Sequence, residues 1–283
     1  MPAIINTNVT SLNAQRNTSA SQMSLTTSMQ RLSSGLRVNS AKDDAAGLAI
    51  AERMNAQVRG MNVAVRNAND GISMAQTAEG ALAKVGDALQ RMRELAVQSR
   101  NGPNSDSARS SLNKEFNELQ KEITRVIGGT SFNGKKILGA DGTTFTFQVG
   151  ANTDTEDAIS VDFENMVSNS TIGSVTDAST AAIGGSGVDA SAIASVIDSI
   201  DAAIDVVNDK RATFGATQSR FEAIISNLQV AVENQSAARS RIVDADFAIE
   251  TANLSRAQIL QQAGNAMIAQ ANQLPQQVLR LLQ

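Results

Sequence analysis

Apolar side chains recur at helical spacing along most of this chain. A first stripe, at steps of four, three and four residues, is Leu25, Met29, Leu32 and Leu36. A longer pattern follows, and its heptad seam is interrupted once, at Glu79. The seam contains Met54, Val58, Met61, Val65, Ala68, Ile72 and Ala75 before the interruption, and Leu82, Val85, Leu89, Met92 and Ala96 after it. These patterns predict a mainly α-helical protein.

The long pattern predicts a helix that begins near Ser40 and ends at Asn101. Gly102 suits the left-handed position after a helix, and Pro103 cannot continue one. At 1.5 Å per residue, about 60 residues would form a rod of roughly 90 Å. A second helix, folded back antiparallel, is predicted by the stripe Leu112, Phe116, Leu119, Ile123 and Val126.

The period changes in the middle of the chain. Asn133-Gly134 is a strong signal for a tight β-hairpin. Alternating apolar positions predict two further strands, one with Phe145, Phe147 and Val149 and one with Ile159, Val161 and Phe163. Residues 167–189 are rich in Ser, Thr and Gly, so we expect an exposed surface loop or the remnant of an insertion site.

Helical spacing returns after residue 190 and continues to the C-terminus. Its inner positions are Ile193, Val196, Ile200, Ala203, Val207, Phe214, Phe221, Ile225, Leu228 and Val232, with Arg211 and Gln218 as exceptions. A last seam is Leu260, Gly264, Met267, Ala271, Leu274, Val278 and Leu281. This is a coiled-coil pattern, which Pro275 should kink or loosen. Alone it would expose much apolar surface, so we expect it to pack on the N-terminal segment and on neighbouring copies.

The distribution of charge supports this pairing of the two ends. Residues 1–42 carry four cations and no acid, and residues 251–283 carry two arginines and no acid. A transit peptide would explain the first segment but not the second. The chain also lacks Trp and Tyr and has only 8 Phe, which indicates thin interfaces between helices.

Composition argues against an enzyme, a cofactor or a metal. The chain has no His for acid-base catalysis, no Cys nucleophile or thiolate ligand, and no phosphate-binding loop. We expect Asp43 and Asp44 in the first helical turn, with Ser40 as N-cap, rather than as metal ligands. Residues 244–250 lack the Gly and distal Glu of a calcium loop. We expect no nucleic-acid binding and no membrane insertion, since neither a basic aromatic patch nor a long apolar run occurs.

Long motifs at both ends of the chain resemble bacterial flagellin, the filament subunit of the flagellum. They are INTNVTSLNAQRN at 5–17, RLSSGLRVNSAKDDAAGLAIAERM at 31–54, NANDGISMAQTAEGAL at 67–82, RSRIVDADFAIETANLSRAQILQQAG at 239–264 and AQANQLPQQVLRLLQ at 269–283. The resemblance covers about residues 1–165 and 190–283. It is a resemblance to a short form without large outer domains.

The resemblance implies a long antiparallel helical coiled-coil bundle with a small β-hairpin region and paired N- and C-termini. Residues 1–40 and 243–283 would form the inner coiled-coil domain, which folds on polymerisation. Residues 41–166 and 190–242 would form an outer helical rod with β-hairpins, and 167–189 the surface loop. The polymerisation seam of the inner domain would comprise Leu25, Met29, Leu32, Leu36, Leu260, Met267, Leu274, Val278 and Leu281.

The resemblance also implies partners. These are other copies in a helical filament, an export chaperone, the flagellar type III export apparatus, and hook-associated junction and cap proteins. Export by that route, without a cleavable signal, would place the protein outside the cell. A host Toll-like receptor would contact Gln90, Arg91, Glu94, Leu95 and Glu115. Candidate glycosylation sites at the filament surface are Ser170, Thr171, Ser174, Thr176, Ser179 and Thr180.

Two other functions are compatible with some features of the chain. Hook–filament junction proteins of the same superfamily have similar termini but typically match these terminal motifs less well. A cytoplasmic signalling hairpin would need symmetric heptads about one tight turn. The hairpins and the Ser/Thr/Gly-rich segment in the middle of this chain do not fit that pattern.

Overall fold

The computed structural model describes residues 7–185 and 188–280, with side chains in the last helix as far as residue 273. It divides into two compact units. Unit 1 comprises Met1–Ala56 and Glu233–Gln283, and unit 2 comprises Gln57–Val232. The predicted mainly helical fold with small β-hairpins and paired terminal helices is confirmed.

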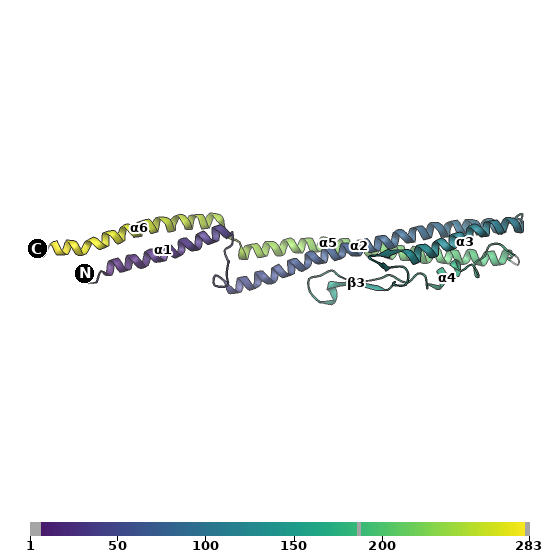
Figure 1. The fold of residues 1–283 in the computed structure, drawn as a ribbon, viewed down its shortest axis with the longest axis horizontal. Helices are drawn as coiled ribbons and strands as arrows, with labels where there is room; N and C mark the ends of the chain where they lie inside the picture. The colour runs from purple at the N-terminus through teal and green to yellow at the C-terminus, as the bar shows by residue number, and fades with distance from the viewer. Residues whose placement is uncertain (1–6, 186–187, 281–283) are drawn as a thin grey trace. The chain divides into compact units, whose positions relative to one another are not determined.

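Unit 1 is built on two antiparallel helices, α1 (Val9–Ser34) and α6 (Phe247–Arg280), which lie side by side (Figure 1). The Asn8 side chain caps α1 by accepting a hydrogen bond from the Ser11 amide, and Gly35 ends it with a left-handed φ of 71°. The Asp246 carboxylate caps α6 by accepting from the amides of Ala248 and Ile249. Pro275 does not end α6, whose backbone stays helical to Arg280.

The two connections that lead into and out of these helices pair with each other. Leu36 forms an isolated antiparallel bridge with Asp244. The Arg37 amide donates to the Val243 carbonyl at 2.7 Å, and the Ala245 amide donates to the Gly35 carbonyl at 2.9 Å. The N-terminal and C-terminal halves of unit 1 are therefore joined by backbone hydrogen bonds, independent of side-chain identity.

The long helix α2 (Ala45–Arg100) begins five residues later than the expected start near Ser40. Its capping residue is Asp44, whose carboxylate accepts a hydrogen bond of 2.8 Å from the Gly47 amide. Asp43 instead closes the preceding turn by accepting from the amides of Asn39 and Ser40 and from the Ser40 hydroxyl. That hydroxyl is the main reason why the pKa of Asp43 lies below its ordinary value. The predicted end of α2 before Gly102 is confirmed.

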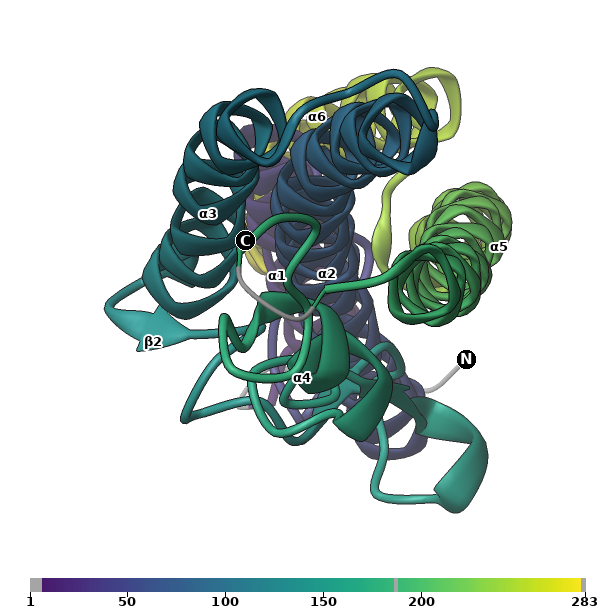
Figure 2. The ribbon, with the colours of Figure 1, turned by 90° about the vertical axis from the view of Figure 1, so that its right-hand side faces the viewer.

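Unit 2 continues with α3 (Asp106–Gly129), which turns back beside α2 (Figure 2). A tight hairpin joins β1 (Ser131–Phe132) to β2 (Lys135–Lys136). Its central residues, Asn133 and Gly134, have φ of 50° and 79°, as a type I′ turn requires. A second antiparallel pair is formed by β3 (Thr144–Gln148) and β4 (Ala158–Asp162). The short 3-10 helix η1 (Thr155–Asp157) lies directly before β4. Both hairpins were predicted.

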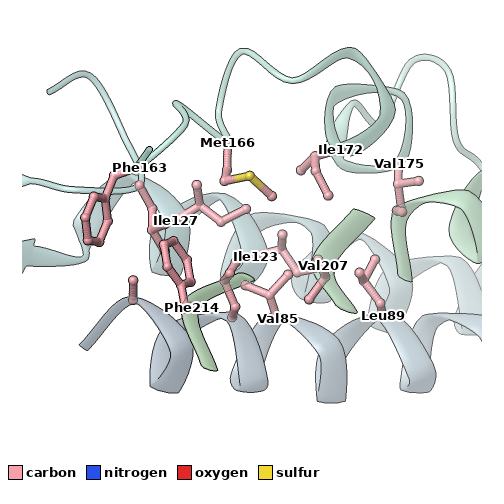
Figure 3. Packing of buried hydrophobic residues seen from close by; sticks show 14 of the residues in the cluster. Val85, Leu89, Ile123, Ile127, Phe163, Met166, Ile172, Val175, Val207 and Phe214 are labelled. Atoms are coloured by element: carbon pink, nitrogen blue, oxygen red, sulfur yellow. The ribbon is translucent and has the colours of Figure 1, made fainter. Parts of the chain in front are cut away.

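The core of unit 2 is one cluster contributed by α2, α3, the strands, α4 (Ser170–Thr176) and α5 (Ala190–Val243). Figure 3 shows part of this cluster and labels ten of its residues, among them Leu89 and Ile123. The Phe163 and Phe214 rings stack at 5.1 Å between centroids, and Phe147 meets Phe221 edge-on at 5.5 Å. Seven of the 8 Phe lie in unit 2, and only Phe247 lies in unit 1. The thin interface predicted from composition therefore applies to unit 1.

The described part of residues 167–189 is not a free surface loop, contrary to expectation. They include α4, and Ile172, Val175, Ala181 and Ile183 from this segment are buried in the core. Polar side chains of α2 and α3 hold its backbone. The Gln120 amide donates to the carbonyls of Val175 and Ala181 at 2.8 and 3.0 Å, and the Ser99 hydroxyl donates to the Ile183 carbonyl at 2.5 Å. The high content of Ser, Thr and Gly suggested an exposed loop. Four buried apolar residues are nevertheless sufficient to anchor the segment on the core.

Candidate functional site

Helices α1 and α6 face each other through small and polar side chains. Buried at this contact are Ser11, Leu25 and Ser28 on α1 and Glu250, Ala257 and Ala271 on α6. Gly264 lies against Thr18 so closely that an added Cβ would stand 2.5 Å from the Thr18 hydroxyl oxygen. Because Gly264 has no side chain, the two helices approach closely at this point.

Hydrogen bonds fix the register of the two helices. The Asn8 side-chain amide donates to the Ala271 carbonyl, and the Ser11 hydroxyl donates to Asn272 Oδ1, each at 2.8 Å. Further along, the side-chain amide of Gln261 donates to that of Gln22. The contact is therefore specific although it contains little apolar surface.

The predicted seam is divided between this contact and the outer surface. On α1, Leu25 is buried, Leu32 is half-buried and Met29 is 56% exposed. Leu36 is half-buried in the connection that follows α1. On α6, Leu260 and Met267 are 51% and 63% exposed. The side chains of Leu274 and Val278, and the whole of Leu281, lie outside the described residues.

Large apolar side chains of α1 and α6 instead remain exposed outside the buried stripe that joins the two helices. Of fourteen large hydrophobic residues exposed in the described chain, ten belong to unit 1. Nine of these form what we term the outward apolar faces: Val9, Leu12, Met23, Met29, Phe247, Ile249, Ile259, Leu260 and Met267. Monomeric soluble proteins rarely keep this much apolar surface in contact with water.

A groove runs between α1 and α6 beside these faces. Met23 and Leu260 are among its lining residues, together with Ser24, Thr27 and Arg256. One end is closed by an ion pair that joins the two helices, in which Arg31 Nη1 lies 3.1 Å from Glu250 Oε1. The Glu250 side chain is only 7% exposed, so it depends on Arg31 for compensation of its charge. Sequence reasoning missed this pair, although Glu250 is the last acid of the chain.

The predicted receptor-contact residues lie in unit 2 and do not share one environment. Gln90, Arg91 and Glu94 on α2 and Glu115 on α3 are exposed. Arg91 bridges Glu94 and Glu115, each at 2.9 Å, and these hydrogen bonds raise the pKa of Arg91. Leu95 is fully buried among the core residues of α2, so its side chain does not contribute to this surface.

The candidate glycosylation sites differ in their solvent exposure and in the hydrogen bonds that their hydroxyl groups form. Ser170, Ser179 and Thr180 are exposed, whereas Thr171, Ser174 and Thr176 are half-buried. The hydroxyls of Ser174 and Thr176 donate to backbone carbonyls within α4. Those of Ser179 and Thr180 donate to Asp177 and to nearby carbonyls.

Two kinds of site are absent from the residues that the structure describes. Within residues 7–185 and 188–280, no three His, Cys, Asp or Glu side chains are grouped so that they could hold a metal ion. Among the described helices, none has an apolar stretch sufficient to cross a bilayer.

Comparison with known proteins covers nearly the whole chain. The bacterial flagellin N-terminal helical region matches residues 5–143, and the bacterial flagellin C-terminal helical region matches residues 197–282. A flagellin from Halalkalibacterium halodurans is 46% identical over 282 residues, covering 99% of both chains. One from Bacillus subtilis is 41% identical over 305 residues, covering 98% of this chain and 99% of its own. The crystal structure of Bacillus cereus flagellin, 29% identical, superposes with a TM-score of 0.50 over 62% of this chain and 94% of its own. The chain therefore belongs to the bacterial flagellin family.

Proposed function

We propose that this flagellin assembles by packing the outward apolar faces of α1 and α6 against neighbouring copies. As a flagellin it is a structural subunit of the bacterial flagellar filament. The observation that carries the proposal is the concentration of exposed large apolar residues in unit 1. A face that packs on a different face of the next copy does not close into a ring, and such contacts generate helical filaments.

A comparison of the free energy gained by burying apolar side chains with the free-energy cost of association favours an extended contact with several copies. Complete burial of one Leu, Ile or Met side chain contributes about 1.5–3 kcal/mol. Association costs about 4–15 kcal/mol in lost translation and rotation. One or two buried side chains cannot offset that cost, whereas most of the nine residues of the outward apolar faces together can.

The family resemblance extends this proposal to the layers of the filament. Residues 1–40 and 243–283 form the inner coiled-coil domain in this proposal. Residues 41–166 and 190–242 form the outer helical rod. The docked segment 167–189 then supplies the hydroxyls for glycosylation, and the exposed Ser170, Ser179 and Thr180 are the most accessible of them.

The same reasoning supplies the partners and the location. The protein leaves the cell through the flagellar type III export apparatus with an export chaperone, and it adjoins hook-associated junction and cap proteins in the extracellular filament. A Toll-like receptor contacts the charged surface of Gln90, Arg91, Glu94 and Glu115. A junction-protein function is not favoured, because the two relatives described above, which are 46% and 41% identical over nearly their full length, are flagellins.

Seeded polymerisation tests the assembly surface. Purified subunit is mixed with short filament seeds, and filament length is measured by negative-stain electron microscopy. We expect long filaments from the wild type and none from Leu260→Glu or Met267→Glu, since a buried unpaired carboxylate is strongly unfavourable. Val167→Glu, at a residue of unit 2 that is 48% exposed, is the matched control and should still polymerise. Normal filaments from both α6 variants would disprove the role of the outward faces.

A further inference from the structure

The methionines of this protein fall into two groups with opposite exposure. Met23, Met29 and Met267, all on the outward apolar faces, are 65%, 56% and 63% exposed. In unit 2, the exposed fractions of Met61, Met74, Met92 and Met166 are 8%, 4%, 0% and 1%. Met54 is half-buried, and Met1 lies outside the described residues.

No other side chain of the protein competes for a mild two-electron oxidant. The chain contains no Cys, Trp, Tyr or His, so the thioether of Met is its only readily oxidised group. Exposure therefore decides which sulfur reacts. Among the described residues, the three strongly exposed methionines all lie where the proposed function needs apolar surface.

We propose that Met23, Met29 and Met267 are oxidation sites, and that their conversion to the sulfoxide by a peroxide weakens polymerisation of the free subunit. This inference rests on the proposed assembly through the outward apolar faces. In the reaction the thioether sulfur attacks one peroxide oxygen and the O–O bond breaks. With hydrogen peroxide, one oxygen becomes bonded to sulfur, which loses two electrons, and the other leaves as water.

The product is poorly suited to a buried contact. The sulfoxide oxygen is a strong hydrogen-bond acceptor, whereas the thioether is apolar and flexible. Burying such an acceptor without a donor is unfavourable. Met23 lines the groove between α1 and α6 together with Leu260, so oxidation there places a polar oxygen beside an apolar position of the other helix.

The same geometry makes the effect specific to the free subunit. In the filament the outward faces are covered by neighbouring copies, so the three sulfurs lose access to peroxide. Oxidation therefore acts before assembly and not after it. Methionine sulfoxide reductases reduce the sulfoxide to the thioether, so the effect on assembly is reversible.

The test treats depolymerised subunit with a limited amount of hydrogen peroxide and locates the oxidised residues by peptide mass spectrometry. We expect Met23, Met29 and Met267 to react well before Met74, Met92 and Met166, which serve as internal references. In seeded polymerisation, the concentration of subunit needed for growth should rise by about tenfold, the change produced by losing one moderately strong contact. Treatment with methionine sulfoxide reductases should restore growth.

The variant M23L/M29L/M267L separates oxidation of these sites from other damage. Leu keeps the apolar volume of Met but has no oxidisable sulfur. The variant is compared with itself, and the subunit concentration that it needs for growth should be the same before and after peroxide treatment. Met166→Leu, at a buried position of unit 2, should remain as sensitive to peroxide as the wild type. Intact wild-type filaments should show slower oxidation of the three sites than free subunit.

Two failures are distinguishable. If untreated wild-type subunit does not grow on seeds, or if untreated Leu260→Glu and Met267→Glu grow normally, the proposed assembly surface is wrong. If wild type grows and subunit fully oxidised at the three sites grows equally well, the assembly surface stands and the oxidation proposal is overturned. Equal oxidation of buried and exposed methionines, or of filament and free subunit, would also overturn it.

Discussion

The guanidinium group of Arg211 on α5 forms an ion pair with the carboxylate of Glu79 on α2. Arg211 Nη2 and Nε lie 2.9 and 3.1 Å from Glu79 Oε1, and both side chains are about one-third exposed. Each residue is an exception in an apolar seam of its own helix. The two exceptions meet, and a shift of either helix by one turn would leave both charges facing apolar residues.

Removal of one member of this pair should weaken unit 2 modestly. For Arg211→Met we expect a loss of about 1 kcal/mol in the free energy of unfolding, because Glu79 keeps a partly buried charge without its partner. The double variant Glu79→Leu with Arg211→Met should recover most of that loss. Urea denaturation followed by circular dichroism measures both, since the chain has no Trp or Tyr for fluorescence. Additive losses in the double variant would contradict coupling between the two residues.

Gly264 should be essential for the contact between α1 and α6. In Gly264→Val the new side chain would collide with Thr18, whose hydroxyl oxygen stands 2.5 Å from the Cβ position. We expect faster amide hydrogen exchange in both helices, measured by mass spectrometry. Gly264→Ala combined with Thr18→Ala should restore protection in part.

Gly215 in α5 provides the matched control for this substitution. An added Cβ at Gly215 meets no atom within 4 Å. Gly215→Ala should therefore leave exchange in α1 and α6 unchanged and stabilise α5 by about 0.5–1 kcal/mol. Normal protection of α1 and α6 in Gly264→Val would show that the close contact is not needed.

The ion pair between Glu164 and Lys210 should make the stability of unit 2 dependent on pH. Their side-chain atoms lie 2.7 Å apart. The hydrogen bond from Lys210, followed by that from Asn169, lowers the pKa of Glu164 below its ordinary 4.5, and the hydrogen bond to Glu164 raises the pKa of Lys210 above 10.5. Both groups are therefore charged in the folded state between these two values, and the stabilisation is complete there.

The stabilisation by this ion pair is lost at low pH through protonation of Glu164 and at high pH through deprotonation of Lys210. Below pH 4.5 the contribution of Glu164 fades as the pH falls through its lowered folded-state pKa, and above pH 10.5 that of Lys210 fades as the pH rises through its raised one. At neutral pH, Glu164→Gln should lower the free energy of unfolding by about 0.5 kcal/mol, since the pair is partly exposed. The difference from wild type should shrink as the pH falls below 4.5. A difference that is constant down to the acid limit would exclude this linkage.

Gln120 should hold the segment 167–189 on α3. In Gln120→Leu the carbonyls of Val175 and Ala181 lose their hydrogen-bond donor, at an expected cost of about 1–3 kcal/mol. Limited proteolysis should then cut more rapidly near the exposed residues Asp177–Thr180. Gln76→Leu, at an exposed position of α2, is the control and should leave the cleavage rate unchanged. Equal cleavage rates in both variants would show that the apolar anchors alone hold the segment.

Local patterns in the sequence were sufficient for most of the secondary structure. The end of α2 before Gly102 and the turn at Asn133-Gly134 follow from the backbone preferences of Gly and Pro, which neighbouring elements do not change. The spacing of apolar residues predicted the long helices and both strands of the second hairpin. Helix α2 starts later than predicted because Ser40 and Asp44 are both good capping residues, and only the folded turn shows which of the two side chains accepts from a free amide of the first helical turn.

The sequence by itself determined the family and the presence of apolar stripes at both ends of the chain. It did not determine which stripe of α6 would face α1, because periodicity gives the angle between residues and not the identity of the neighbour. The tertiary structure decided that point. Small residues such as Gly264 and Ala271 allow the closest backbone approach, so they occupy the contact with α1 and leave Leu260 and Met267 exposed. The burial of Leu95 and the docking of residues 167–189 have the same origin, since both depend on packing partners that are distant in the sequence.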